Sequence, residues 1–284
     1  MNRGWAIAAC ALATAAFADD DAARWYLRVD NDVVFHTDRW YTSGIRLARV
    51  KDGIEWGIAQ ELYTPEVKYI SQTLQDRAPA GRLYASVSKH IEAESTFDTL
   101  ELDAGVRGPS ALGEQAQNGV HNIVESGAKV DWSRQLSDEF DGSAIAVRTQ
   151  SLGAGFRGHA GLVAGTQVTF AHVGLEWRYG EAQALSSAMM RFAATPPFHS
   201  GAQGWSAYIG ASARGVARNE LLSKNYYTFG PDLEKKNEVT RFAGGLTLAQ
   251  HWGNLTFDLV QDSREFEGQR ATHAFGSLAL HVNF

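Results

Sequence analysis

The feature that most constrains the fold of this chain is a succession of segments of about ten residues in which apolar and polar side chains alternate. Residues 100–106 and 255–259 show the pattern clearly. A period of two residues is typical of a β-strand with one apolar face, and helical spacing is largely missing. A soluble sandwich would alternate too, but with shorter strands. Because segments of this length cross a bilayer at a tilt, we predict an all-β fold, a transmembrane antiparallel β-barrel.

The last segment points to the barrels of Gram-negative outer membranes. One face of it carries Gly276, Leu278, Leu280, Val282 and Phe284, and the other carries Ser277, Ala279, His281 and Asn283. A terminal phenylalanine that closes an alternating strand resembles the recognition signal of outer-membrane barrel assembly. We therefore expect the assembly machinery to bind this chain through Phe284.

The first residues have the pattern of a secretory signal peptide. Arg3 supplies positive charge, residues 4–15 form an apolar run, and Ala16-Phe17-Ala18 is a cleavage site of small residues. We predict a signal peptide over residues 1–18 and one outer-membrane barrel domain over residues 19–284. Cys10, the only cysteine, lies in the removed segment. A lipoprotein signal ending at Cys10 is the alternative, although its apolar region would be only about six residues long.

Charge and hydropathy exclude two other classes of protein. The formal net charge is −6 and no block rich in Lys and Arg follows the signal, so nucleic acid is not an expected partner. No run of 18 apolar residues follows the signal either, which excludes a transmembrane helix on length. An outer-membrane location stays open, because barrel strands bury only every second residue in lipid.

Two long stretches interrupt the alternation. Residues 108–140 contain a short helical pattern at residues 116–125, where Val120 shares a face with Ala116. Residues 182–204 form the second stretch. Long loops of this size usually have a use, and in outer-membrane barrels they lie on the extracellular side. We expect both stretches to face outward there.

A cluster of oxygen-bearing side chains near the start is a candidate metal site. Asn31 and Asp32 are followed by the run His36-Thr37-Asp38-Arg39-Trp40-Tyr41-Thr42. Carboxylate and amide oxygens are the ligands that Ca²⁺ takes, but a solvated strand end rich in Asx turns has the same composition. Because alternation sends Asn31 and Asp32 to opposite faces, one site can use both only at a bulge or a strand end.

His121, inside the first long stretch, is the candidate base. Histidine titrates near neutral pH and can take a proton from water, although a single loop histidine is more often passive. The sequence has no Gly-x-Ser-x-Gly elbow, no glycine-rich phosphate loop and no His-Glu-x-x-His pair. Nucleophilic serine catalysis therefore has no support in the sequence.

An ordered series of short motifs resembles the lipid A 3'-O-deacylase family of outer membranes. No single motif is specific, but their succession covers nearly all of the chain after the signal. The series consists of Asn31-Asp32, Tyr41-Thr42-Ser43-Gly44, residues 59–65, Asp76-Arg77 with Ala80-Gly81, residues 105–109, Gln117-Asn118 with His121, Trp132 with Gln135-Leu136, and Lys224-Asn225-Tyr226.

The resemblance implies a twelve-stranded barrel with a Ca²⁺-dependent site between its wall and a loop helix. Such an enzyme acts on lipid A, the anchor of lipopolysaccharide in the outer leaflet, and hydrolyses the ester of its 3'-linked acyloxyacyl group. His121 would match the histidine that activates water. Asn31, Asp32 and Thr42 would match polar residues around the metal and the ester, and Lys68 would match a lysine that holds an oxyanion or a phosphate.

One departure from the family leaves alternatives open. The family has a glutamate six residues after its histidine, where this chain has Gly127, and the nearest carboxylates in sequence are those of Glu125 and Asp131. A carboxylate on the second ring nitrogen fixes the histidine tautomer, so its loss weakens catalysis unless Glu125 substitutes for it. A non-catalytic structural or interaction barrel and a phospholipase-type barrel hydrolase are the alternative functions.

Overall fold

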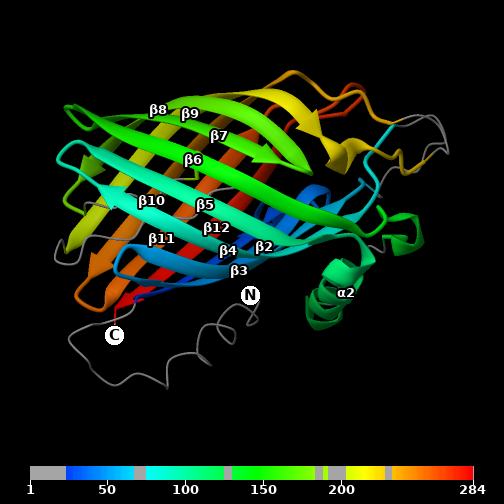
Figure 1. The fold of residues 1–284 in the computed structure, drawn as a ribbon, viewed down its shortest axis with the longest axis horizontal. Helices are drawn as coiled ribbons and strands as arrows, with labels where there is room; N and C mark the ends of the chain where they lie inside the picture. The colour runs from blue at the N-terminus through cyan, green and yellow to red at the C-terminus, as the bar shows by residue number, and fades with distance from the viewer. Residues whose placement is uncertain are drawn as a thin grey trace.

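The described residues form a closed barrel of twelve antiparallel strands (Figure 1). This computed structural model describes residues 24–66, 75–124, 130–182, 188–190, 203–227 and 232–283. Each strand pairs with its neighbours in the sequence, and β1 pairs with β12 to close the sheet. The strands are β1 (Arg24–Asn31), β2 (Trp40–Lys51), β3 (Ile54–Thr64), β4 (Ala80–Glu92), β5 (Thr96–Arg107), β6 (Glu139–Gly153), β7 (Phe156–Gly165), β8 (Val168–Gly180), β9 (Gly204–Asn219), β10 (Glu238–Gln250), β11 (Gly253–Asp262) and β12 (His273–Asn283). The predicted twelve-stranded barrel is confirmed, and the soluble sandwich is wrong.

The two faces of the sheet differ in polarity, as the alternation predicts. Large apolar side chains such as Ile58, Leu102 and Phe242 are more than half exposed, at 53%, 61% and 61%. In β12, Leu278 is exposed while Ser277 and His281 are buried. An outward apolar face and a polar interior are typical of a barrel that lies in lipid. Residues 1–23 and Phe284 lie outside the described residues, so the signal peptide and the assembly signal stay predictions.

Buried ion pairs fill much of the barrel interior. Arg46 lies 2.9 Å from Glu55 and 3.1 Å from Glu101, through separate guanidinium nitrogens, and Arg82 lies 2.6 Å from Asp141. All of these side chains are at least nine-tenths buried. Removing one partner of such a pair would strand a buried charge, which costs about 3–5 kcal/mol.

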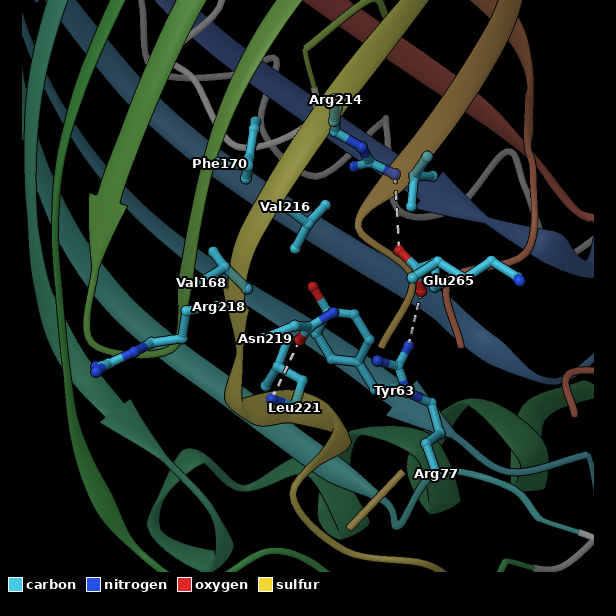
Figure 2. A pocket seen from close by; sticks show the side chains of 12 residues that line it. Tyr63, Arg77, Val168, Phe170, Arg214, Val216, Arg218, Asn219, Leu221 and Glu265 are labelled. Atoms are coloured by element: carbon cyan, nitrogen blue, oxygen red, sulfur yellow. Dashed lines mark hydrogen bonds and ion pairs between the residues drawn. The ribbon is translucent and has the colours of Figure 1, made fainter. Parts of the chain in front are cut away.

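Figure 2 shows a further cluster of charges inside the barrel wall. Glu265 lies between two guanidinium groups, 3.3 Å from Arg77 and 3.7 Å from Arg214. The ring of Tyr63 lies 4.8 Å from the guanidinium carbon of Arg77. The space left among these side chains measures about 20 Å³, which is room for about one water molecule. Side chains therefore fill most of the space in this cluster.

The two ends of the barrel differ in their connections. We call the end that carries Arg24 and Asn283 the terminal end, and the opposite end the loop end. Three of the connections at the terminal end are two-residue turns, at residues 52–53, 154–155 and 251–252. Short turns of outer-membrane barrels face the periplasm, so the loop end is the extracellular one.

The connection from β8 to β9 corrects one of the predictions. It leaves Gly180 and returns at Gly204 at the terminal end, although we expected residues 182–204 to face the extracellular side. Its described residues 188–190 lie against the barrel interior: Ala188 N–H donates to the Tyr208 hydroxyl at 2.9 Å, and Arg241 donates to Ala188 O at 2.8 Å. Residues 188–190 lie inside because the interior offers polar partners to their backbone.

The predicted loop helix is present as α2 (Gly113–Val124), between β5 and β6 at the loop end (Figure 1). No helix among the described residues is long and apolar enough to span a bilayer. Val120, on the expected apolar face, is 50% exposed, whereas Gln117 is 4% exposed. The helix therefore turns a polar side toward the protein.

Candidate functional site

A glycine turn and two close contacts hold α2 against the outer side of β3 and β4. The chain leaves β5 through Gly108, whose φ of +113° suits glycine and whose N–H donates to Gly81 O at 2.9 Å. The 3-10 helix η2 (Pro109–Ala111) follows, and Gln60 of β3 donates to Ala111 O at 2.6 Å. A Cβ on Gly81 would lie only 3.2 Å from Gly113 Cα, so the absence of a side chain permits this approach.

The helix brings His121 to the loop between β1 and β2. His121 Nε2 lies 3.3 Å from a carboxylate oxygen of Asp38, and both side chains are 16% exposed. A histidine paired with a carboxylate and still reached by solvent is the arrangement that a general base requires. The structure thus makes His121 more than an isolated loop histidine.

A short hydrogen-bond chain positions Asp38. Gln117, one turn before His121 on the same helical face, donates to the other carboxylate oxygen of Asp38 at 3.0 Å. The buried indole of Trp132 in turn donates to Gln117 Oε1 at 2.9 Å. These contacts fix the carboxylate in a defined orientation toward the histidine ring.

Asn31 and Asp32 lie where β1 ends, which satisfies the strand-end condition. The 3-10 helix η1 (Asp32–Phe35) follows, and the Asn31 side chain caps it by accepting from Val33 N at 2.7 Å. Asp32 is 1% exposed, and its Oδ2 accepts from Thr37 Oγ1 at 2.8 Å and from Arg39 N at 2.9 Å. Burial, with a smaller contribution from the charge of Asp38, raises the pKa of Asp32 to about 8 against the lowering effect of these hydrogen bonds.

Of the other site residues predicted from the sequence, the structure describes Thr42 but not Lys68 or Glu125. Thr42 is buried at a bulge in β2, and its hydroxyl is hydrogen-bonded to that of Thr64. Lys68, Glu125 and Gly127 lie outside the described residues. Asp131, the other carboxylate near His121 in sequence, caps the 3-10 helix η3 (Trp132–Arg134) by accepting from Ser133 N at 3.1 Å.

The donor set at the end of β1 suits a hard cation. The described residues contain no cluster of three or more His, Cys, Asp or Glu side chains that could hold a metal. The Asp32 carboxylate nevertheless accepts the hydrogen bonds from Thr37 and Arg39 through Oδ2 alone. The Asp32 carboxylate and the Asn31 amide oxygen, which also accepts from Val33 N, are donors of the kind that Ca²⁺ takes, and the ion would need further ligands from substrate or water.

Asp38 is the site residue that sequence reasoning missed. It lies in the polar run of residues 36–42. Nothing in the sequence indicates that Asp38, and not the nearby Asp32, would contact a histidine. Its partner His121 is far away in the sequence, and only the docking of α2 on the barrel wall brings the two together.

Comparison with known proteins agrees with this architecture. The family model of the outer membrane protein LpxR matches residues 5–55 and 48–284. The solved structure of LpxR from Salmonella typhimurium is similar over 92% of this chain and 100% of that chain, with 18% identity and a TM-score of 0.76. The β domain of the Bordetella autotransporter BrkA covers 93% of this chain and 98% of its own, with 10% identity and a TM-score of 0.41. No curated protein matches the sequence. Since the family model spans nearly the whole sequence, the chain belongs to the LpxR family of outer membrane proteins.

Proposed function

We propose that this protein is a lipid A deacylase that hydrolyses the ester of the 3'-linked acyloxyacyl group in the outer leaflet. The observation that carries the proposal is the His121–Asp38 pair at the loop end of the barrel. Family membership supports the same activity. A carboxylate from the β1–β2 loop makes up for the glutamate that this chain lacks at Gly127.

Exposed apolar side chains on η1, which precedes Asp38, and on α2, which carries His121, fit a lipid substrate. Val33, Val34 and Phe35 of η1 are 46%, 43% and 40% exposed, and Val120 of α2 is 50% exposed. Apolar groups exposed beside a polar pair suit a molecule with acyl chains next to a polar ester. A polar, water-soluble substrate would have no apolar groups to pack against these side chains.

Asp38 determines which ring nitrogen of His121 acts as the base. Because Nε2 lies 3.3 Å from the carboxylate, we place the ring proton on Nε2, which leaves Nδ1 as the acceptor. Nδ1 takes a proton from a water molecule, and the resulting hydroxide attacks the ester carbonyl. Asp38 stabilises the imidazolium that forms, and the proton then passes to the leaving alkoxide.

Calcium is the cofactor we propose, with Asp32 and Asn31 as its protein ligands. When bound, Ca²⁺ would supply a Lewis acid that stabilises the negative charge on the ester oxygen. Thr42 lies at the same rim, where its hydroxyl can orient the ester. We assign Lys68 the family role of holding an oxyanion or a phosphate, and Glu125 no longer has to substitute for the missing glutamate.

The test is mass spectrometry of lipid A from Gram-negative cells that express the protein. Wild type and His251→Ala, a change in an exposed turn at the opposite end, should both remove the 3'-linked group. His121→Ala should leave the barrel folded and lipid A intact, and EGTA should stop the reaction until Ca²⁺ is restored. Unchanged processing by His121→Ala or in EGTA would contradict the mechanism. If cells with the wild-type protein keep intact lipid A, the non-catalytic barrel is favoured. If the protein releases fatty acid from glycerophospholipid vesicles, the phospholipase-type hydrolase is favoured.

A further inference from the structure

The outward face of the barrel contains an apolar hollow far from the candidate site. It has a volume of about 440 Å³ and lies across β3 to β7. Its floor consists of three exposed alanines, Ala144 and Ala146 of β6 and Ala164 of β7. Small side chains on three neighbouring outward positions leave a depression where larger ones would have made the wall flush.

Leucines form the walls of this hollow. Leu100 and Leu102 of β5 flank the alanines on one side, at 51% and 61% exposure, and Leu162 of β7 flanks them on the other, at 52%. From Ile54 on β3 to Leu162 on β7 the hollow crosses four strand spacings, or about 19 Å. A hollow of this length and volume suits a single long acyl chain.

A cation lies at one end of the hollow. Lys89 lines it, three residues before the end of β4, and therefore lies near the terminal end of the barrel. Its Nζ lies over the β2–β3 turn, 3.6 Å from where a Cβ on Gly53 would be. Within the part of the chain that the structure describes, Lys89 has no ion-pair partner. Arg148, on the same side, does not compete with it for an anion, because its charge is paired with that of Asp98 at 2.7 Å.

We propose that the hollow binds one glycerophospholipid of the periplasmic leaflet, with an acyl chain over the alanines and the phosphate at Lys89. Lipid tails are as apolar as the wall, so the hydrophobic effect alone gives no preference for this position. Selection comes from close packing in the hollow and from the charge of the phosphate, which a lysine holds as a point charge. The phosphates of lipid A lie at the opposite surface of the membrane, too far from Lys89. This proposal does not depend on the hydrolytic activity.

The test is native mass spectrometry of the full-length protein, purified in detergent and titrated with phosphatidylglycerol. Ala146→Trp fills the hollow and should abolish retention of the lipid. Ala211→Trp, at an exposed outward position on β9, should not affect retention. Lys89→Gln should weaken binding about five-fold, and Arg49→Gln, an exposed position on β2 outside the hollow, should leave it unchanged. The shift of the folded band on heating checks that each barrel is formed.

Several results would overturn the proposal. Equal retention by wild type and Ala146→Trp would show that the hollow is not the site. If Ala146→Trp and Ala211→Trp lost the bound phosphatidylglycerol equally, the lipid would be bound non-specifically around the barrel and not in the hollow. If the protein retained lipid A in preference to phosphatidylglycerol, and Ala146→Trp abolished that retention, the hollow would bind a lipid of the outer leaflet and the proposal would be wrong. If Ala146→Trp does not fold, unchanged binding by Lys89→Gln would by itself contradict the role of the cation.

Discussion

At the scale of single residues, the proposed ester hydrolysis depends on the pairing of His121 with Asp38. A histidine without a partner can adopt either tautomer, and only one of them presents a free lone pair to water. The 3.3 Å contact with Asp38, which Gln117 holds in place, favours the tautomer that carries its proton on Nε2. In the proposed mechanism, Asp38 takes the place of the family glutamate that is missing at Gly127.

Replacing Asp38 with Asn tests this role. The amide would keep the hydrogen bond from Gln117 but turn its NH₂ group toward Nε2, which favours the tautomer whose Nδ1 is protonated. We expect kcat for lipid A deacylation to fall by about 100-fold or more while KM is unchanged, because in the proposed mechanism Asp38 acts through His121 and not on the substrate. Asp131→Asn, at a carboxylate that only caps η3, is the matched control. A wild-type kcat for Asp38→Asn would remove the carboxylate from the mechanism.

At the scale of elements, the position of α2 on the barrel wall creates the site. The helix could be predicted from sequence because residues 116–125 have helical spacing, but its docking could not. Docking depends on Gly81 and Gly108, which look like ordinary strand and turn glycines in the sequence. The side of the connection from β8 to β9 was assigned wrongly for a similar reason, since its length alone does not tell at which end of a closed barrel it lies.

A valine at position 81 should displace the helix. Its Cβ would lie 3.2 Å from Gly113 Cα and from Ala111 Cβ, so α2 must move outward and carry His121 with it. Displacement by about 1 Å can cost about 100-fold in rate. We expect Gly81→Val to deacylate lipid A at least ten-fold more slowly than wild type, with a normal folded band on a gel. Gly215→Val, where a Cβ meets nothing within 4 Å, should react at the wild-type rate. Equal rates for all three proteins would show that docking is not critical.

At the scale of the whole molecule, the alternating pattern was enough to predict the barrel, the outward apolar face and the closing strand. It did not show how the interior would be filled, because an inward position appears in the sequence only as a polar residue. Arg46, Glu55 and Glu101 come from three different strands, and their pairing depends on the register of a closed sheet. Such networks follow from the strand count and register, which the sequence alone constrains only loosely.

The interior network gives a prediction about the stability of the whole barrel. Arg46→Met leaves the carboxylates of Glu55 and Glu101 buried without their shared cation, and should lower the free energy of unfolding by about 3–5 kcal/mol. A triple variant that combines Arg46→Met with Glu55→Gln and Glu101→Gln removes the stranded charges and should recover much of that loss. Guanidinium unfolding of the protein in detergent micelles, followed by tryptophan fluorescence, measures both differences. Arg49→Met, at an exposed outward position of the same strand, should change the unfolding free energy by less than about 1 kcal/mol. A single Arg46→Met variant as stable as wild type would mean that water reaches the network, and that the interior is far more open than its ion pairs indicate.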